Sequence, residues 1–384
     1  MMIDRLMEKD IRRSLRHFPV TAITGPRQCG KTTLAKRIIA DSPQGIYLDL
    51  ELPSDAAKLT EAELFFRSRK GKPICLDEIQ RRPDLFPLIR ALVDEWNAPG
   101  AFLILGSASR DLLRQSSESL AGRISYLRLT PFLWEEIREF YSLEQYLSMG
   151  AFPKSLLLGD PEISYKWRED FIATFLERDI PQWTGAAPAG IRRLWRMLAH
   201  LNGQTPNYTR IGSSLGVSDR TVRNHIDLLS DTYMLDVIPP FRSNLGKRLI
   251  KAPKIYLSDT GITAALLGLG NFEDMLGHPG YGALWEQMVL ANLRGNFPSA
   301  EISFYRTAAG AEMDFTVALK GRMFAVECKA SLSPALTRGA HDAIRDISPE
   351  RTFVVAPVEE AYPMAEGIDV IPLARLREAF DSDL

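Results

Sequence analysis

The sequence is poor in cysteine, because its 384 residues include only Cys29, Cys75 and Cys328, each far from the others. This spacing offers neither a disulfide framework nor a cysteine-based metal site, and it is typical of a reducing compartment. Long apolar runs are also missing, since no stretch of about 18 apolar residues occurs. The charged start, MMIDRLMEKDIRRSLRHF, lacks the apolar core of a signal peptide. From these absences we expect a cytoplasmic protein without a membrane span.

An excess of charge of one sign is missing as well. Lys and Arg number 47 and Asp and Glu number 48, which gives a formal net charge of -1. Any contact with nucleic acid must therefore come from local basic patches rather than from an overall field. A hydrophobic content of 45% and a charged content of 25% are typical of a globular protein. The length predicts two to four domains.

The clearest motif lies near the start of the chain. Residues 20–24, VTAIT, form a β-rich run, Gly25 to Thr32 spell G-x-x-x-x-G-K-T, and residues 32–40 continue with helical spacing. In this context the N–H groups of the loop and helix N-terminus can cradle phosphates. We expect Lys31 to reach the β- and γ-phosphates of ATP and Thr32 to ligate Mg²⁺. The predicted nucleotide-binding residues are Gly25, Pro26, Arg27, Gln28, Cys29, Gly30, Lys31, Thr32, Thr33 and Ser107.

A second motif supports the first. Residues 72–80, KPICLDEIQ, read as an apolar strand that ends in Asp77 and Glu78. A carboxylate at a strand end beside the phosphate loop can hold Mg²⁺ through water, and its neighbour can polarise the attacking water. We therefore assign Asp77 to the metal and Glu78 to the water. A further buried-looking strand precedes Ser107, which either senses the γ-phosphate or caps a helix.

These motifs resemble a large prokaryotic family of AAA-type P-loop ATPases that carry a C-terminal domain of unknown function. The resemblance rests on TGPRQCGKTTL, LDEIQ, GSASRDLL followed by LAGR, and LRLTPFLWEEI, and it continues through FLERDI, YLSDTGI and ALWEQMVLANL. It implies an α/β fold with a RecA-like parallel sheet, a helical lid and frequent assembly into rings. In such rings an arginine of one subunit can complete the neighbour's site. Arg110, Arg114 and Arg123 are the candidates, with Arg123 preferred, although each is equally a surface arginine.

We predict four domains from this reading. Residues 1–135 form the ATPase core, residues 136–200 the helical lid, residues 201–257 a winged helix-turn-helix, and residues 258–384 an α/β domain resembling restriction endonucleases. The predicted fold class is therefore α/β with a helical middle region.

The winged helix-turn-helix prediction rests on residues 207–235. A short helix through Leu215, a turn at residues 216–218 and a second helix from Asp219 have the proportions of this motif. Two β-like stretches around a basic segment, which also contains Arg242 and Lys254, would form the wing. The module either contacts DNA or docks on protein. The predicted DNA-binding residues are Arg220, Thr221, Arg223, Asn224, Lys247, Arg248 and Lys251.

The last third contains a nuclease-like pattern. MDFTVALKGRMFAVECKAS, residues 313–331, reads as two strands around a Gly-containing turn, and a helix upstream carries Glu286. In the family pattern this glutamate joins an aspartate and an E-x-K pair, which resembles the restriction-endonuclease-like fold. Carboxylates there would bind Mg²⁺ and the lysine would orient water against a phosphodiester. The alternative is a domain that grips DNA or supports assembly without cutting. The aspartate lacks its usual preceding proline, and Glu312 is a possible extra ligand. Such buried groups either bind metal or form ion pairs. The matching positions are Glu286, Asp314, Glu327 and Lys329.

Three functions remain open from the sequence. The leading hypothesis is an oligomeric, Mg²⁺-dependent ATPase that binds DNA and translocates or remodels duplex or branched substrates. Its layout is similar to that of Holliday-junction branch-migration motors. The second is an ATP-gated, metal-dependent nuclease in repair or defence. The third is a nucleotide-driven switch that binds a protein partner.

Overall fold

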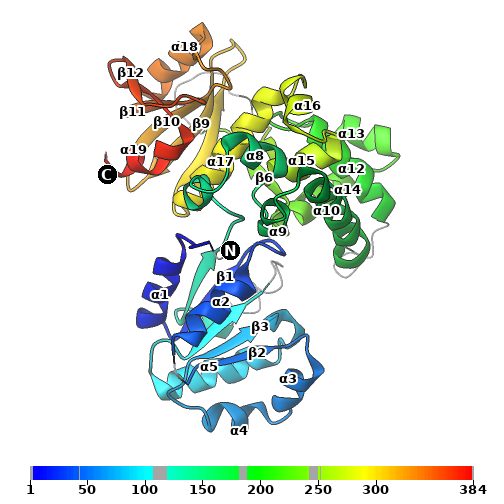
Figure 1. The fold of residues 1–384 in the computed structure, drawn as a ribbon, viewed down its shortest axis with the longest axis vertical. Helices are drawn as coiled ribbons and strands as arrows, with labels where there is room; N and C mark the ends of the chain where they lie inside the picture. The colour runs from blue at the N-terminus through cyan, green and yellow to red at the C-terminus, as the bar shows by residue number, and fades with distance from the viewer. Residues whose placement is uncertain are drawn as a thin grey trace. The chain divides into compact units, whose positions relative to one another are not determined.

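A computed structural model describes residues 3–42, 44–106, 119–180, 188–241, 250 and 252–382. It divides into two compact units, which are described separately (Figure 1). The first comprises Met1–Phe132 with Asp231–Tyr233, and the second comprises Leu133–Ser230 with Met234–Leu384. The predicted end of the ATPase core at residue 135 lies close to the end of the first unit. The boundaries predicted at residues 200 and 257 fall inside the second unit.

The first unit is built on a five-stranded sheet in the order β2-β3-β4-β1-β5. All neighbouring strands in it are parallel, as predicted. Because parallel strands need crossover connections, helices cover the sheet on both faces. The strands are β1 (Val20–Thr24), β2 (Ile46–Asp49), β3 (Ile74–Asp77), β4 (Phe102–Leu105) and β5 (Ile124–Arg128). The helices are α1 (Glu8–His17), α2 (Lys31–Ala40), α3 (Pro53–Lys58), α4 (Ala62–Arg67), the 3₁₀ helix η1 (Ile79–Arg81) and α5 (Leu85–Trp96).

Alternating apolar side chains give this sheet two separate cores. Leu76 of β3 packs in one cluster with side chains of α4 and α5. Its neighbour Cys75 packs in the other cluster, with side chains of α1 and α2. This alternation is the two-residue period of a strand that is buried on both faces. As a result β1, β3 and β4 are held in fixed register, and the loops that follow them meet at one edge of the sheet.

The second unit begins with a helical part. Its core contains the fully buried Trp195 and Leu198, together with side chains from the helices that surround them. Asp259 is buried and caps a helix, because its carboxylate accepts hydrogen bonds from the N–H groups of Ala151 and Ile262. The helices are α7 (Trp134–Ile137), α8 (Leu143–Met149), α9 (Pro153–Leu157), α10 (Pro161–Thr174), the π-helix η2 (Phe175–Asp179), α12 (Pro188–His200), α13 (Tyr208–Leu215), α14 (Asp219–Asp231), α15 (Thr260–Leu267) and α16 (Phe272–Leu276).

Helix α13 ends at Leu215 and helix α14 begins at Asp219, as predicted, while the winged helix-turn-helix itself stays a prediction. Gly216 ends α13 in the left-handed region, with φ of 69°, and the Ser218 hydroxyl accepts a hydrogen bond from the N–H of Thr221 at 3.1 Å. On α14 the apolar side chains of Val222, Ile226 and Leu229 are buried. The strands β6 (Leu235–Ile238) and β7 (Lys254–Leu257) follow as an antiparallel pair.

The unit ends in a six-stranded mixed sheet with the order β12-β13-β11-β10-β9-β8. Its strands are β8 (Glu301–Arg306), β9 (Glu312–Leu319), β10 (Arg322–Cys328), β11 (Arg351–Val355), β12 (Tyr362–Ala365) and β13 (Ile368–Ile371). The predicted strand–turn–strand over residues 313–331 is confirmed as β9 and β10. The accompanying helices are α17 (Tyr281–Asn296), α18 (Arg338–Ile347), the 3₁₀ helix η3 (Leu373–Arg375) and α19 (Leu376–Asp381). The Trp285 indole N–H fastens α17 to β11 by donating to the Val355 carbonyl at 3.0 Å.

Candidate nucleotide site and carboxylate cluster

The loop between β1 and α2 has the strained backbone of a phosphate-binding loop. Gly25 has φ of 146° and Gly30 has φ of 99°. A Cβ atom at Gly25 would lie 2.1 Å from the Leu129 carbonyl oxygen, so only glycine fits there. Gln28 also lies in the left-handed region, with φ of 60°. This path ends at Lys31, the first residue of α2, and brings the loop to the helix N-terminus, where anions are favoured.

Lys31 is held inside this loop by backbone oxygens. Its Nζ donates to the carbonyl of Gly25 at 3.0 Å and to that of Pro26 at 2.8 Å. The side chain is buried, whereas the neighbouring Thr32 and Thr33 are exposed. Because its partners are neutral carbonyls, the ammonium charge remains available for an anion.

Thr32 and Asp77 come together as the two motifs predict. The Thr32 hydroxyl donates to Asp77 Oδ2 at 2.7 Å, and the Tyr47 hydroxyl from β2 donates to the same oxygen at 2.6 Å. Burial raises the pKa of the Tyr47 phenol, and the hydrogen bond to Asp77 raises it further. Tyr47 therefore stays a proton donor near neutral pH and orients the Asp77 carboxylate toward the phosphate loop.

Glu78 adopts an uncommon backbone conformation directly after β3. Its φ is 55°, in the left-handed region that few non-glycine residues enter. The Glu78 N–H donates to Asp77 Oδ1 at 2.9 Å, and the Gln80 side-chain amide donates to the Glu78 carboxylate. The backbone of Glu78 is therefore strained directly beside Asp77. Such strain is common at functional sites.

Arg5 braces the phosphate loop, a role that the sequence did not predict. Its guanidinium donates to the carbonyl oxygens of Cys29 at 2.9 Å and Thr130 at 2.6 Å. It also lies 4.9 Å from the centre of the Phe132 ring. Arg5 and Tyr47 both bind partners far away in the chain, so no local motif marks them.

Of Ser107 and the three arginines proposed to act at the nucleotide site, the structure describes only Arg123. Ser107, Arg110 and Arg114 lie outside the described residues. Arg123 directly precedes β5, at the edge of the sheet where strands begin, and its Nη2 donates to Asp94 Oδ2 at 2.9 Å. The phosphate loop lies at the opposite edge, where β1 ends. A role for Arg123 in a neighbouring subunit stays a prediction.

The predicted DNA-binding residues are only partly described. Arg220, Arg223 and Asn224 are exposed on α14, while Thr221 is half-buried with its hydroxyl 2.9 Å from that of Ser218. The Arg223 guanidinium lies 4.5 Å from the centre of the Tyr208 ring. Arg242, Lys247, Arg248 and Lys251 lie outside the described residues.

The position expected for Lys254 is wrong. Sequence reasoning put Lys254 on an exposed basic strip, but it is 2% exposed. Its Nζ lies 3.1 Å from Glu312 Oε1 and 3.8 Å from Asp314 Oδ1. It is buried because β7 pairs with β6 in the interior, and the nearby carboxylates compensate its charge.

The four residues of the predicted nuclease site do meet around this lysine. We call Glu286, Glu312, Asp314 and Glu327 the carboxylate cluster. Lys329 Nζ donates to Glu327 Oε1 at 2.7 Å. Among the remaining contacts, the Tyr256 hydroxyl donates to Glu286 Oε2 at 2.7 Å, the Cys328 N–H donates to Asp314 Oδ2 at 2.8 Å, and Glu312 also pairs with Arg306 at 3.3 Å.

Burial shifts the proton affinity of the cluster. Burial and, next to it, the Asp314 charge raise the pKa of Glu286 to about 8 and that of Glu327 to about 7. Burial raises the pKa of Asp314 as well. For Lys254 burial acts in the opposite direction, but the surrounding carboxylates outweigh it and its pKa is raised. The raised pKa values keep Lys254 charged and favour proton binding on Glu286, Asp314 and Glu327.

Two observations bear on metal ions and membranes. Within the described part of the chain, no three or more His, Cys, Asp or Glu side chains are grouped to hold a metal ion. Thr32 and Asp77 form a different donor set, in which a hydroxyl and a carboxylate oxygen converge, and oxygen ligands of this kind suit Mg²⁺. No described helix combines the length and apolar character needed to cross a membrane.

The first unit has the sheet, loop and paired motifs of an AAA-type P-loop ATPase. A family model described as an AAA domain matches residues 17–138. Models described as domains of unknown function match residues 141–273 (DUF8612) and residues 281–376 (DUF4143). The protein belongs to the family of the uncharacterized proteins Mb2031c of Mycobacterium bovis and Rv2008c of Mycobacterium tuberculosis. It is 38% identical to each over 363 residues, which cover 94% of this chain and 82% of each relative.

Solved structures resemble the chain more distantly. The Walker-type ATPase PABY2304 of Pyrococcus abyssi is 14% identical, with 69% of this chain and 96% of that chain covered and a TM-score of 0.47. The signal transduction ATPase PH0952 of Pyrococcus horikoshii, which has a tetratricopeptide repeat sensor, is 12% identical. In that comparison 78% of this chain and 46% of the other are covered, with a TM-score of 0.30. At these TM-scores neither resemblance supports a conclusion about the fold or function of this chain.

Proposed function

We propose that the protein is a Mg²⁺-dependent ATP hydrolase that works on DNA as an oligomer. The observation that carries the hydrolase is the 2.7 Å contact between Thr32 and Asp77 at the end of β3. This contact brings a hydroxyl and a carboxylate from the two nucleotide-binding motifs to one point beside the phosphate loop. The AAA domain match over residues 17–138 agrees with it.

The residues divide the work between binding and water activation. The loop N–H groups and Lys31 bind the phosphates, and Lys31 exchanges its carbonyl partners for phosphate oxygens when ATP enters. Thr32 and Asp77 would hold Mg²⁺, which neutralises phosphate charge when bound. Glu78 orients and polarises the attacking water, and Tyr47 keeps Asp77 in its orientation.

Steady-state ATPase assays with two variants test this assignment. Glu78→Gln should retain ATP binding and lose about 100-fold in turnover, because the water is no longer polarised. Lys9→Gln, an exposed change on α1, is the matched control and should turn over ATP at the original rate. Unchanged turnover in Glu78→Gln would remove Glu78 from the mechanism.

Contact with DNA is supported by α14. Arg220, Arg223 and Asn224 are exposed near its N-terminal end, on the side away from the buried Val222 and Ile226. A helix that follows a tight turn presents such residues to a major groove. Movement or remodelling of duplex or branched DNA is the finer form of this proposal.

A DNA-stimulation assay tests that contact. The double variant Arg220→Ala/Arg223→Ala should lose duplex binding and any DNA-dependent increase in ATP turnover, while basal turnover stays unchanged. Arg193→Ala/Arg196→Ala removes the same charge from exposed positions on α12 and should retain both properties. If single-strand, duplex, forked and four-way DNA leave binding and turnover unaffected, the DNA proposal fails and the protein-partner switch takes its place.

Phosphodiester cleavage is a second candidate with one observation in its favour. Glu327 Oε2 is buried and, among the described residues, has no hydrogen-bond partner, so a ligand could satisfy it. The Lys254 ammonium already lies against Asp314 and Glu312, however, and would repel a divalent cation. The cluster therefore supports an ion-paired role better than cleavage. DNA nicking that requires Mn²⁺ and disappears in Asp314→Asn, while ATP turnover is retained, would favour cleavage over the ion-paired role.

A further inference from the structure

We propose that the first unit contains a second ligand site, for a small organic anion with an apolar body, at the edge of the sheet where the strands begin. The site is a cavity of about 490 Å³. Pocket volumes of roughly 300–1,000 Å³ are typical of small-molecule sites. It is enclosed by α1, the end of α2, the turn before β3 and the segment between α5 and β4.

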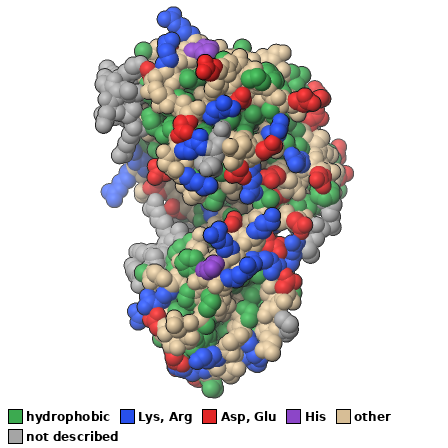
Figure 2. Space-filling view, turned by 90° about the vertical axis from the view of Figure 1, so that its left-hand side faces the viewer, with side chains coloured by type: hydrophobic (Ala, Val, Ile, Leu, Met, Phe, Trp, Pro, Cys, Tyr) green, Lys and Arg blue, Asp and Glu red, His purple; other side chains and the backbone are tan. Residues whose placement is uncertain are grey.

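The lining has an apolar floor and a basic rim. Leu15, Ile38 and Trp96 contribute to the floor, and Trp96 stacks on Phe102 of β4 with ring centres 5.7 Å apart. Arg16, Lys70 and Lys72 contribute the basic groups. In Figure 2, Lys and Arg side chains lie beside apolar surface on the face of this unit that carries α1. This combination suits an apolar ring or chain that ends in a carboxylate, sulfonate or phosphate.

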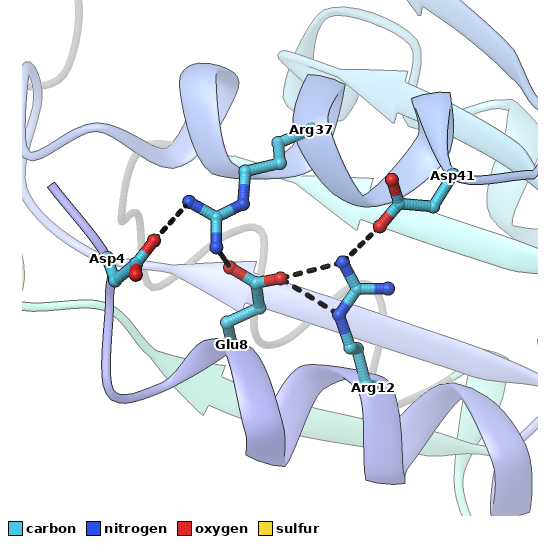
Figure 3. A network of polar contacts seen from close by, with 5 residues as sticks. All are labelled: Asp4, Glu8, Arg12, Arg37 and Asp41. Atoms are coloured by element: carbon cyan, nitrogen blue, oxygen red, sulfur yellow. Dashed lines mark hydrogen bonds and ion pairs between the residues drawn. The ribbon is translucent and has the colours of Figure 1, made fainter. Parts of the chain in front are cut away.

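The basic residues of the cavity lining outnumber its acidic residues. Asp41 is the acidic residue of the described lining, and Arg12 already pairs with it. Figure 3 shows that this pair belongs to a network of α1 and α2, in which Glu8 bridges Arg12 and Arg37, and Arg37 also binds Asp4. Within the described residues, Arg16, Lys70 and Lys72 form no ion pair. An anion entering the cavity would therefore supply the missing negative charge.

The site is separate from the ATP site but shares a helix with it. Lys31 begins α2 at the phosphate loop, and Ile38 near the end of α2 lines the cavity. Pro73 and Ala101, which precede β3 and β4, also line it, whereas ATP is expected where those strands end. The two ligands should consequently bind at the same time.

Fluorescence titration of the full chain with anilinonaphthalene sulfonate tests the proposal. This probe joins two aromatic rings to one sulfonate, and we expect saturable binding of one probe per chain. Arg16→Gln and Lys72→Gln should each weaken it by about tenfold, since each removes a charge-assisted contact. Arg13→Gln, an exposed change on the same helix outside the cavity, should leave the affinity unchanged. N-phenylnaphthylamine, which lacks the sulfonate, should bind at least about fivefold more weakly.

Four results would overturn the proposal. These are equal affinity of the two probes, equal affinity in Arg16→Gln and the original chain, displacement of the probe by ATP with Mg²⁺, and loss of probe binding as the chain self-associates. The third would assign the probe to the nucleotide site, and the fourth would assign the cavity to a contact between copies. Circular dichroism of each variant confirms that the comparison is made on folded protein.

Discussion

The phosphate loop of the first unit contains a buried lysine and the carboxylate cluster of the second surrounds one, but the two lysines have different partners. Lys31 donates to two carbonyl oxygens of its own loop. Lys254 lies against Glu312 and Asp314. In the first unit the lysine charge has no carboxylate partner and can bind a phosphate. In the second unit the lysine charge is already paired with carboxylates.

This difference distinguishes a site that can bind an anion from a buried cluster in which the lysine is already paired with carboxylates. A lysine held by neutral carbonyls exchanges them for an anion and gains a charge-assisted contact. Lys254 would have to give up carboxylate partners in a place with little water, which is costly for all the charges involved. The motif residues alone do not reveal this contrast, because the partners of Lys254 lie on a strand that is distant in the sequence.

The largest expected effect is on the phosphate loop of the first unit. Lys31→Ala should reduce kcat/KM for ATP by about 100-fold or more, because it removes the buried ammonium group that is expected to bind the β- and γ-phosphates. Phosphate release assays measure it, with Lys9→Ala as the exposed lysine control. If folded Lys31→Ala kept its ATP turnover, Lys31 would not be needed to bind the phosphates, and the proposed contrast with Lys254 would be wrong.

The second effect concerns stability. Lys254→Met should lower the free energy of unfolding of the second unit by about 3 kcal/mol, because it leaves buried carboxylates without their cation. Urea denaturation followed by tryptophan fluorescence measures the change. The exposed Lys154→Met should stay within about 0.5 kcal/mol of the original chain. An unchanged free energy of unfolding in Lys254→Met would mean that the carboxylate cluster does not depend on the Lys254 charge.

The third effect is a pH dependence of the same unit. The folded pKa values of Glu286, about 8, and Glu327, about 7, lie above the ordinary value of 4.5. Between pH 5 and 8 the folded chain therefore holds protons that the unfolded chain has released, so its stability must fall as pH rises. We expect a loss of about 1–3 kcal/mol over that window, measured by denaturation at several pH values.

Glu286→Gln provides the comparison for this pH effect. It cannot titrate, so its stability should fall less steeply over the same pH window. Equal slopes for the variant and the original chain would show that Glu286 does not bind the proton.

The smallest effect sharpens the nucleotide site. Tyr47→Phe should lower ATP turnover by about threefold to tenfold, because Asp77 loses one of its two side-chain donors but keeps Thr32. Its stability should change by less than about 1.5 kcal/mol. If turnover is unaffected, Tyr47 does not help to orient Asp77.

The sequence predicted the elements whose signal is local. The phosphate loop between β1 and α2, Asp77 at the end of β3, and the boundaries of α13 and α14 follow from short motifs with glycine or capping residues at fixed spacing. The parallel sheet followed from the family resemblance, and the parallel pairing of its strands confirms it. Local geometry is encoded locally, so one stretch of sequence suffices to predict it.

Contacts between distant segments were missed where no pair of motifs marks them. Tyr47 reaches Asp77, Arg5 reaches Cys29 and Thr130, and Lys254 reaches Glu312, across separations that no motif spans. Lys254 was misplaced because a basic segment around it favoured an exposed strip. Its burial is decided by the pairing of β7 with β6 and by carboxylates on β9, a tertiary effect that charge counting does not capture.

ATP turnover in Asp77→Asn beside Asp49→Asn tests the central claim most directly. These aspartates end neighbouring strands and are register partners, but Asp77 is the one that binds Thr32. The account predicts that Asp77→Asn loses about 100-fold in turnover while Asp49→Asn stays within about threefold of the original rate. Equal rates in the two variants, or full activity in Asp77→Asn, would contradict it.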